Sequence, residues 1–307
     1  MKKSLFLATV VLLALSQMSF AQAENHFLGK WNITGDAPHA SYVYWLEVKE
    51  KDGKLEVWFL NRGGSAFKPE QPAIEGGKLT FTVKEKQPQP FEARIEGDRL
   101  AGTFRTEKET VNFHGVRPPK WAEFNANGKH TFEQSIELFD GKSMNGWGFQ
   151  NKKNPSGWKV EGGILENEPN ADNLVSLQKF TNFKLQMEYK LEPKSNSGIY
   201  LRGRYELQVL DDAGKPAESH GHMSIYGRTA PLVNSSKPAG EWQTMEAVLV
   251  GNRVTVHLNG KKVHDNAAIE GITGGSLDSS ELDAGPLMIQ GDHGRIWIKK
   301  ITLTPIR

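Results

Sequence analysis

The densest group of side chains that could bind or activate a polar substrate lies in residues 198–210. Read as one strand, this stretch alternates its side chains between two faces. One face would carry Tyr205, Leu207 and Val209, and the other Arg202, Arg204, Glu206 and Gln208. A guanidinium can bind sugar hydroxyls through its planar set of N–H donors, and a carboxyl can donate or accept a proton. We therefore expect Arg202, Glu206 and Gln208 to line one pocket; the alternative is an ordinary solvated sheet face.

A second group of candidate side chains lies in a short turn between two expected strands. Gly291 and Gly294 flank Asp292 and His293, directly after Gln290. Such a turn would present both side chains outward, and an imidazole titrates near neutral pH. His293 is therefore a candidate acid or base; the alternative is a plain hairpin turn.

The pair His220 and His222 has a His-x-His spacing that could supply two metal ligands. No third ligand is evident from the spacing; the alternative is a polar loop that leads into a strand. The chain contains no Cys, which excludes thiolate ligands, disulfides and a cysteine nucleophile. No cofactor is assigned with certainty, and a divalent metal stays open.

Several standard catalytic motifs are missing from the sequence. There is no Gly-x-Ser-x-Gly elbow, no phosphate-binding loop, and no Glu-x-Asp-x-x-Glu strand of the kind found in jelly-roll glucanases. Glu206 and Asp211 are five residues apart and would lie on opposite faces of a strand. An ordinary glycosidase needs two carboxyls facing each other across one site, so this mechanism is not supported.

Short alternating runs separated by Gly-rich turns predict an all-β chain in two parts. Turns such as Asp52-Gly53 divide residues 24–117 into short strands, which predicts a small antiparallel barrel-like domain. Gly29-Lys30-Trp31 opens it as in lipocalin-like barrels, and Trp31 is expected to plug one end. About ten strands in residues 136–307 predict a two-sheet jelly-roll sandwich. Pro118-Pro119 interrupts the pattern, so residues 118–135 are expected to form a linker.

The first 23 residues have the pattern of a signal peptide. Lys2 and Lys3 precede an apolar run from Leu5 to Leu15, and Ala21-Gln22-Ala23 supplies small residues for cleavage after Ala23. The expected product is exported to the periplasm or secreted, with no integral membrane segment. Removing two Lys and no acid takes the net charge from +2 to +2 − 2 = 0. This balance argues against nucleic acid as a partner.

Seven sequence blocks, in order, resemble the 3-keto-disaccharide hydrolase family, long described as a domain of unknown function. They are residues 137–147 (ELFDGKSMNGW), 196–202, 205–211, 225–227, 237–242, 258–260 and 287–294. The resemblance covers about residues 136–307 and leaves the role of residues 24–117 open. One departure is Met223-Ser224, where the family pattern has Gly-Ala before Ile225-Tyr226.

The resemblance implies a concanavalin-like jelly roll that acts on glycosides oxidised at C3 of the sugar. A C3 ketone acidifies the C2 hydrogen, so a base can remove it and the C1 substituent can leave by elimination. Addition of water then completes a net hydrolysis. We infer catalytic roles for Glu206 and His293. The inferred substrate-binding residues are Arg202, Gln208, Asp211, His222, Tyr226 and Gln290.

The expected partner is a carbohydrate, and the sequence leaves the oligomeric state open. Two other function classes also stay open. A non-catalytic carbohydrate-binding protein would use the same sandwich, with aromatic rings stacking on sugars, but would not require Glu206 and His293. A cell-surface interaction protein would tolerate the loss of both residues.

Overall fold

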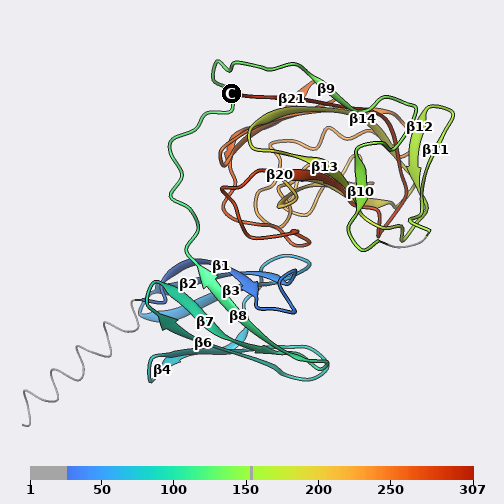
Figure 1. Cartoon of the computed structure of the whole chain (residues 1–307). Coiled ribbons are helices and arrows are strands. Elements are labelled where there is room, and N and C mark those ends of the chain that lie inside the picture. Colours follow the sequence, from blue (N-terminus) through green and yellow to red (C-terminus); the bar gives the residue numbers. More distant parts are fainter. Residues whose placement is uncertain (1–25, 153–154) are drawn as a thin grey trace, which may run out of the picture. The chain divides into compact units, whose positions relative to one another are not determined.

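A computed structural model describes residues 26–152 and 155–307 and is built from β-strands. The chain divides into two compact units (Figure 1). The first holds residues up to Arg62 together with Ala66–Pro118, and the second holds Gly63–Ser65 and Pro119–Arg307. The predicted signal peptide lies outside the described residues. No helix in the described ranges is long and apolar enough to cross a membrane.

The first unit is one antiparallel meander of eight strands in the order β3-β2-β1-β8-β7-β6-β5-β4. An isolated bridge between Phe59 and Phe67 links its two ends, so the sheet is nearly closed into a barrel. The strands are β1 Gly29–Gly35, β2 Val43–Lys51, β3 Lys54–Asn61, β4 Glu70–Glu75, β5 Lys78–Val83, β6 Gln89–Glu96, β7 Arg99–Arg105 and β8 Thr110–Val116. The predicted barrel-like domain is confirmed, with β4 and β8 added to the expected strands.

Aromatic side chains fill the interior of this barrel. Phe81 and Phe91 stack at 4.2 Å between ring centroids, and Phe91 stacks on Phe113 at 4.8 Å. Trp31 is 1% exposed, as expected of a residue that plugs one end, and its indole donates to the Phe27 carbonyl. The Arg117 guanidinium covers the Trp31 ring at 3.6 Å.

The second unit is a sandwich of two sheets, as predicted. One sheet has the order β10-β13-β20-β15-β16, and the other β11-β12-β21-β14-β17-β18-β19 with β9 paired to β21. Figure 1 shows β14 and β21 in one layer and β13 and β20 in the other. The strands are β9 Ile136–Phe139, β10 Trp147–Phe149, β11 Trp158–Glu161, β12 Ile164–Asn167, β13 Leu174–Phe180, β14 Phe183–Leu191, β15 Asn196–Leu201, β16 Tyr205–Leu210, β17 Gln243–Val250, β18 Arg253–Leu258, β19 Lys261–Ala268, β20 Gly285–Ile289 and β21 Ile296–Pro305.

Burial differs between the two sheets. In β14 the buried residues Leu185, Met187 and Tyr189 alternate with more exposed Gln186 and Glu188, as in a sheet with one wet face. In the five-stranded sheet, by contrast, β15 and β16 are buried on both faces. Loops therefore cover the side of this sheet that faces away from the sandwich core, and polar residues there are withdrawn from water.

The expected single strand from Gly198 to Leu210 is wrong. The chain turns back at Arg202-Gly203-Arg204, and β15 pairs antiparallel with β16 from Leu201↔Tyr205 to Asn196↔Leu210. Arg202 and Gly203 have positive φ values of 54° and 66°, which glycine adopts without strain and which ends an extended strand. Alternation along residues 198–210 could not reveal this turn.

The segment predicted as a linker, residues 118–135, is packed against the second unit from Pro119 onward. The Asn127 side chain accepts from Thr255 Oγ1 at 2.7 Å and donates to Asp265 at 2.6 Å. Ala126 is buried, and its amide donates to Asn266. The contacts of this segment therefore attach it to β18 and β19.

Candidate active site

The register of β15 and β16 gathers polar side chains on one face of the five-stranded sheet. Tyr200 lies opposite Glu206, and Gly198 lies opposite Gln208. Directly opposite residues of an antiparallel pair point to the same side. Tyr200, Glu206 and Gln208 therefore share a face, while Leu207 and its neighbours of the other parity face the sandwich core.

Gln290 joins this face from the end of β20. The backbone amide of Gln290 donates to the Gly198 carbonyl at 2.8 Å, and its backbone carbonyl accepts from Ser197 Oγ. The Gln290 Oε1 atom is buried and has no hydrogen-bond partner in the described part of the chain.

Residues 222–226 extend this face by running along the free edge of β16. The backbone amide of Gln208 donates to the Ser224 carbonyl, and the backbone amide of Tyr226 donates to the Glu206 carbonyl, both at 3.0 Å. Ile225 thus lies opposite Leu207, which puts Ser224 beside Gln208 and Tyr226 beside Glu206. Met223 has a φ of 59°, which fits the glycine expected there from the family pattern.

Glu206 is a buried carboxyl, 4% exposed, that lies over Gly198. A Cβ at position 198 would collide with Glu206 Oε1, so the glycine leaves the space that this carboxyl occupies. Burial raises the pKa of Glu206 to about 8, the hydrogen bond with Tyr200 opposes this rise, and the negative charge of Asp292 adds to it. At neutral pH Glu206 is therefore mostly protonated.

Two tyrosine hydroxyls accompany the Glu206 carboxyl. The Tyr200 hydroxyl donates to the Gly274 carbonyl at 3.0 Å and is also hydrogen-bonded with Glu206. Burial raises the pKa of half-buried Tyr226, and the Glu206 charge raises it further.

The Gly291–Gly294 turn presents the second candidate, His293. Its side chain is 48% exposed, and Nδ1 lies 2.7 Å from Asp292 Oδ1. Both flanking glycines are required by close approach, since a Cβ on Gly291 would strike the Asp172 carbonyl and one on Gly294 would strike Ser195. The turn is thus fixed by packing on both sides of Asp292-His293.

Three residues predicted to bind substrate lie elsewhere in the structure. Arg202 is in the turn, 2% exposed, and its guanidinium donates to the carbonyls of Gly251 and Glu281. Its expected place on the Glu206 face is wrong because the chain reverses there. Asp211 lies beyond the end of β16, where its carboxylate accepts from the Lys194 amide at 2.8 Å.

His222 does not present a ring nitrogen to the site. It is 1% exposed, with Nε2 2.8 Å from the Tyr189 hydroxyl and Nδ1 2.7 Å from the Leu210 carbonyl oxygen. Burial lowers the pKa of this imidazole. Because both nitrogens are engaged within the protein, the expected substrate contact and the His220–His222 metal pair are not supported. Across residues 26–152 and 155–307, no cluster of three or more His, Asp or Glu side chains is arranged to hold a metal ion.

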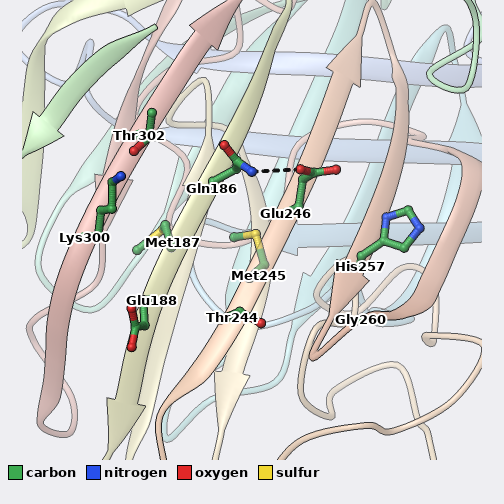
Figure 2. Close-up of a pocket in the computed structure, with 10 residues that line it drawn as sticks. All are labelled: Gln186, Met187, Glu188, Thr244, Met245, Glu246, His257, Gly260, Lys300 and Thr302. Atoms are coloured by element: carbon green, nitrogen blue, oxygen red, sulfur yellow. Dashed lines mark hydrogen bonds between the residues drawn. The ribbon is translucent and has the colours of Figure 1, made fainter.

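A groove of about 450 Å³ lies on the other sheet, over β21, β14, β17 and β18 (Figure 2). It contains none of the predicted site residues. Several of its polar groups are paired with neighbours: Gln186 with Glu246 at 3.0 Å, and Glu188 with Lys299 at 2.9 Å. Such pairs are common on a solvent-exposed sheet face and do not indicate a binding site. The candidate site is therefore the face of the five-stranded sheet that carries Glu206.

Sequence reasoning missed the residues that hold Glu206 and His293 in place. Asn173 precedes β13 and Asn167 ends β12, yet both bond to the Gly291–Gly294 turn more than 110 positions later. Tyr200 likewise carries no sequence signal of its contacts with Glu206 and Gly274. The hydrogen bonds of all three depend on strand neighbours that are distant in sequence, and no local pattern marks them.

The polar face lies on a two-sheet jelly roll, and this part of the chain matches a known family. Residues 134–304 match the model of the 3-keto-alpha-glucoside-1,2-lyase-like domain, and the chain belongs to this family. A relative from Bacteroides thetaiotaomicron named 3-keto-disaccharide hydrolase is 28% identical over 158 residues. The match covers 40% of this chain and 54% of the relative, so the chain spans about half of that protein's length.

Two solved structures from Parabacteroides distasonis, both described as candidate glycosyl hydrolases, also resemble the chain. The first is 28% identical with a TM-score of 0.48, covering 55% of this chain and 82% of that one. The second is 20% identical with a TM-score of 0.47, covering 56% and 94%.

Proposed function

We propose that this chain is an enzyme that cleaves the glycosidic bond of 3-keto-glycosides. The observation that carries the proposal is that this member of the family has two titratable side chains, Glu206 and His293, in different environments. Glu206 is buried, with a pKa of about 8, and His293 is half exposed, with Nδ1 bound to a carboxylate. Groups held in different environments in this way can serve as acid and base in one reaction.

The proposed reaction begins at C2 of the oxidised sugar. His293 takes the C2 proton, which the neighbouring C3 ketone acidifies, and an enolate forms. The C1–O bond then breaks, a C1–C2 double bond forms, and protonated Glu206 gives its proton to the departing oxygen. Addition of water across that double bond yields the free 3-keto-sugar. Gln208, Gln290 and Tyr226 are the proposed contacts to sugar hydroxyls.

The direct test is incubation of the purified protein with a 3-keto-glucoside and, separately, with its unoxidised parent. We expect aglycone to be released from the keto substrate only, since the parent C2 hydrogen is not acidic. Absence of release from both substrates contradicts the proposal. Binding of unoxidised glycan without cleavage would instead favour a carbohydrate-binding protein.

The same reaction in deuterium oxide distinguishes elimination from direct hydrolysis. Elimination followed by hydration puts a solvent deuteron at C2 of the released sugar, whereas direct hydrolysis leaves the original C2 hydrogen. The control is the same free 3-keto-sugar incubated without protein, which measures spontaneous exchange. A product with no deuterium above this control contradicts the elimination step.

We also propose that the protein is exported after removal of residues 1–23. The charged start, the apolar run and the small residues before Glu24 support this proposal. Sequencing of the exported protein should begin at Glu24, and an exported form that begins at Met1 would contradict cleavage.

A further inference from the structure

The Gly291–Gly294 turn carries two adjacent side chains that bond to each other. Asp292 Oδ1 lies 2.7 Å from His293 Nδ1. Both side chains are partly open to solvent, 38% for Asp292 and 48% for His293. Adjacent residues in a free loop have no reason to keep this contact, because holding two side chains in one arrangement costs entropy.

Buried Asn173 holds the backbone on the Asp292 side of the turn. Its Oδ1 accepts from the amides of Gly291 at 2.8 Å and Asp292 at 3.3 Å, and its Nδ2 lies 3.5 Å from Asp292 Oδ2. Asn173 is itself fixed, since its Nδ2 donates to Gln150 Oε1 at 2.8 Å. The Asn173 amide therefore aligns with both the backbone and the carboxylate of Asp292.

Asn167 holds the two ends of the same turn. Its Nδ2 donates to the carbonyls of Gly291 and Gly294 at 3.1 and 2.9 Å, and its Oδ1 accepts from the Ile296 amide at 2.8 Å. Two buried asparagines thus fix a four-residue turn whose outward groups are one carboxylate and one imidazole.

From this geometry we propose that Asp292 is a positioning residue that keeps the proton of neutral His293 on Nδ1. An ionised carboxylate only accepts hydrogen bonds, so the ring nitrogen facing it must be the one that carries hydrogen. The Nε2 lone pair is then free and points away from Asp292. This inference rests on the proposed function, in which that lone pair takes the C2 proton.

The test is Asp292→Asn, which keeps the shape of the side chain. An amide can donate to Nδ1, which favours hydrogen on Nε2 and removes the free lone pair there. Long-range proton–nitrogen NMR of labelled full-length protein, at a pH where the ring is neutral, reports which nitrogen carries hydrogen. We expect hydrogen on Nδ1 in the wild type and a shift of the His293 signal toward the other tautomer in Asp292→Asn. The spectrum of His293→Ala assigns the signal.

Kinetics supply the second measurement. Asp292→Asn should lower kcat on a 3-keto-glucoside by about 10²–10⁴-fold, with KM changed by less than about threefold, as for other residues that orient a catalytic imidazole. Asp265→Asn is the matched control, because Asp265 is an exposed carboxylate bonded to Lys262 and Asn127. The control should leave both the tautomer and kcat unchanged.

The outcomes separate this inference from the proposed function. Retention of the wild-type tautomer in Asp292→Asn overturns the inference, and so does an unchanged kcat in an active enzyme. If the wild type turns over no keto substrate, the proposed function fails. The NMR result still decides whether Asp292 sets the His293 proton, because it requires no substrate.

Discussion

Glu206 lies on a strand buried on both faces, and its environment makes its charge depend on pH near neutrality. The pKa of about 8 in the folded protein exceeds the ordinary glutamate value of 4.5, chiefly because of burial. Between these pH values the folded protein binds more protons at this site than the unfolded chain does, so its contribution to stability falls as pH rises. The charged form is the one that destabilises the fold.

Glu206→Gln should therefore become more stable relative to the wild type as pH rises from about 4.5 to about 8. Each pKa unit corresponds to about 1.4 kcal/mol, so the difference between the two proteins should change by roughly 3–5 kcal/mol across this range. Urea unfolding of both proteins at pH 5, 7 and 9 measures it. A difference that stays constant with pH would contradict a raised pKa.

The protonated state of Glu206 also predicts how activity responds to pH. If its proton goes to the departing oxygen, kcat should fall tenfold per unit above about pH 8, as the carboxyl ionises. The measurement is the pH profile of kcat on a 3-keto-glucoside. Activity that continues to rise to pH 10 would contradict the role of acid.

His293→Ala and Glu206→Gln should each lower turnover of the keto substrate by roughly 10²–10⁴-fold, the usual span for acid and base groups. The double variant should lose far less than the product of the two losses, because the residues act in one reaction sequence. Steady-state kinetics of the three variants measure this. Near-normal turnover in His293→Ala would show that the base is another residue.

At the scale of elements, the β15–β16 hairpin depends on the backbone of its turn. Gly203 has a φ of 66°, and a Cβ there would lie 2.8 Å from Leu277 Cδ1. Gly203→Ala should lower the free energy of unfolding by about 1–3 kcal/mol, from strain and crowding together. Thermal and urea unfolding measure the change.

Gly214→Ala provides the matched control for this hairpin. Gly214 has a φ of 80°, but a Cβ there would meet no atom within 4 Å. Gly214→Ala should lower the free energy of unfolding by about 1 kcal/mol, from backbone strain alone. Equal losses in Gly203→Ala and Gly214→Ala would contradict close packing of the hairpin turn against Leu277.

At the scale of the whole molecule, we predict that the second unit folds alone if it keeps its leading segment. A fragment from Pro119 to Arg307 retains the bonds of Asn127 to Thr255 and Asp265, whereas a fragment from Ile136 loses them. At about 1 kcal/mol per hydrogen bond, and with the burial of Ala126 also lost, the shorter fragment should be less stable by about 3 kcal/mol. Urea unfolding of both fragments compares them. Equal stability would show that residues 119–135 are a free linker.

Local patterns in the sequence determined most of the strands, the all-β class and the face shared by Glu206 and Gln208. Alternation of side chains and the positive φ of Gly-rich turns are properties of neighbouring residues, so they can be read without a fold. The family blocks likewise drew attention to Gly291–Gly294. The same reasoning failed to predict the turn at Arg202-Gly203-Arg204. Polar and apolar side chains alternate along residues 198–210 in a way that fits either one strand or two.

Only the tertiary structure decided which of these side chains meet and what their surroundings do to them. Glu206 acquires its raised pKa because it is buried: Gly198 makes room for the carboxyl, and the segment around Ser224 and Tyr226 covers the edge of β16. The hydrogen bond with Tyr200 partly opposes this rise. Asn167 and Asn173 fix the His293 turn from positions more than 110 residues earlier in the chain. Burial and hydrogen bonding are set by the distances between folded segments, and a strand pattern carries no information about those distances.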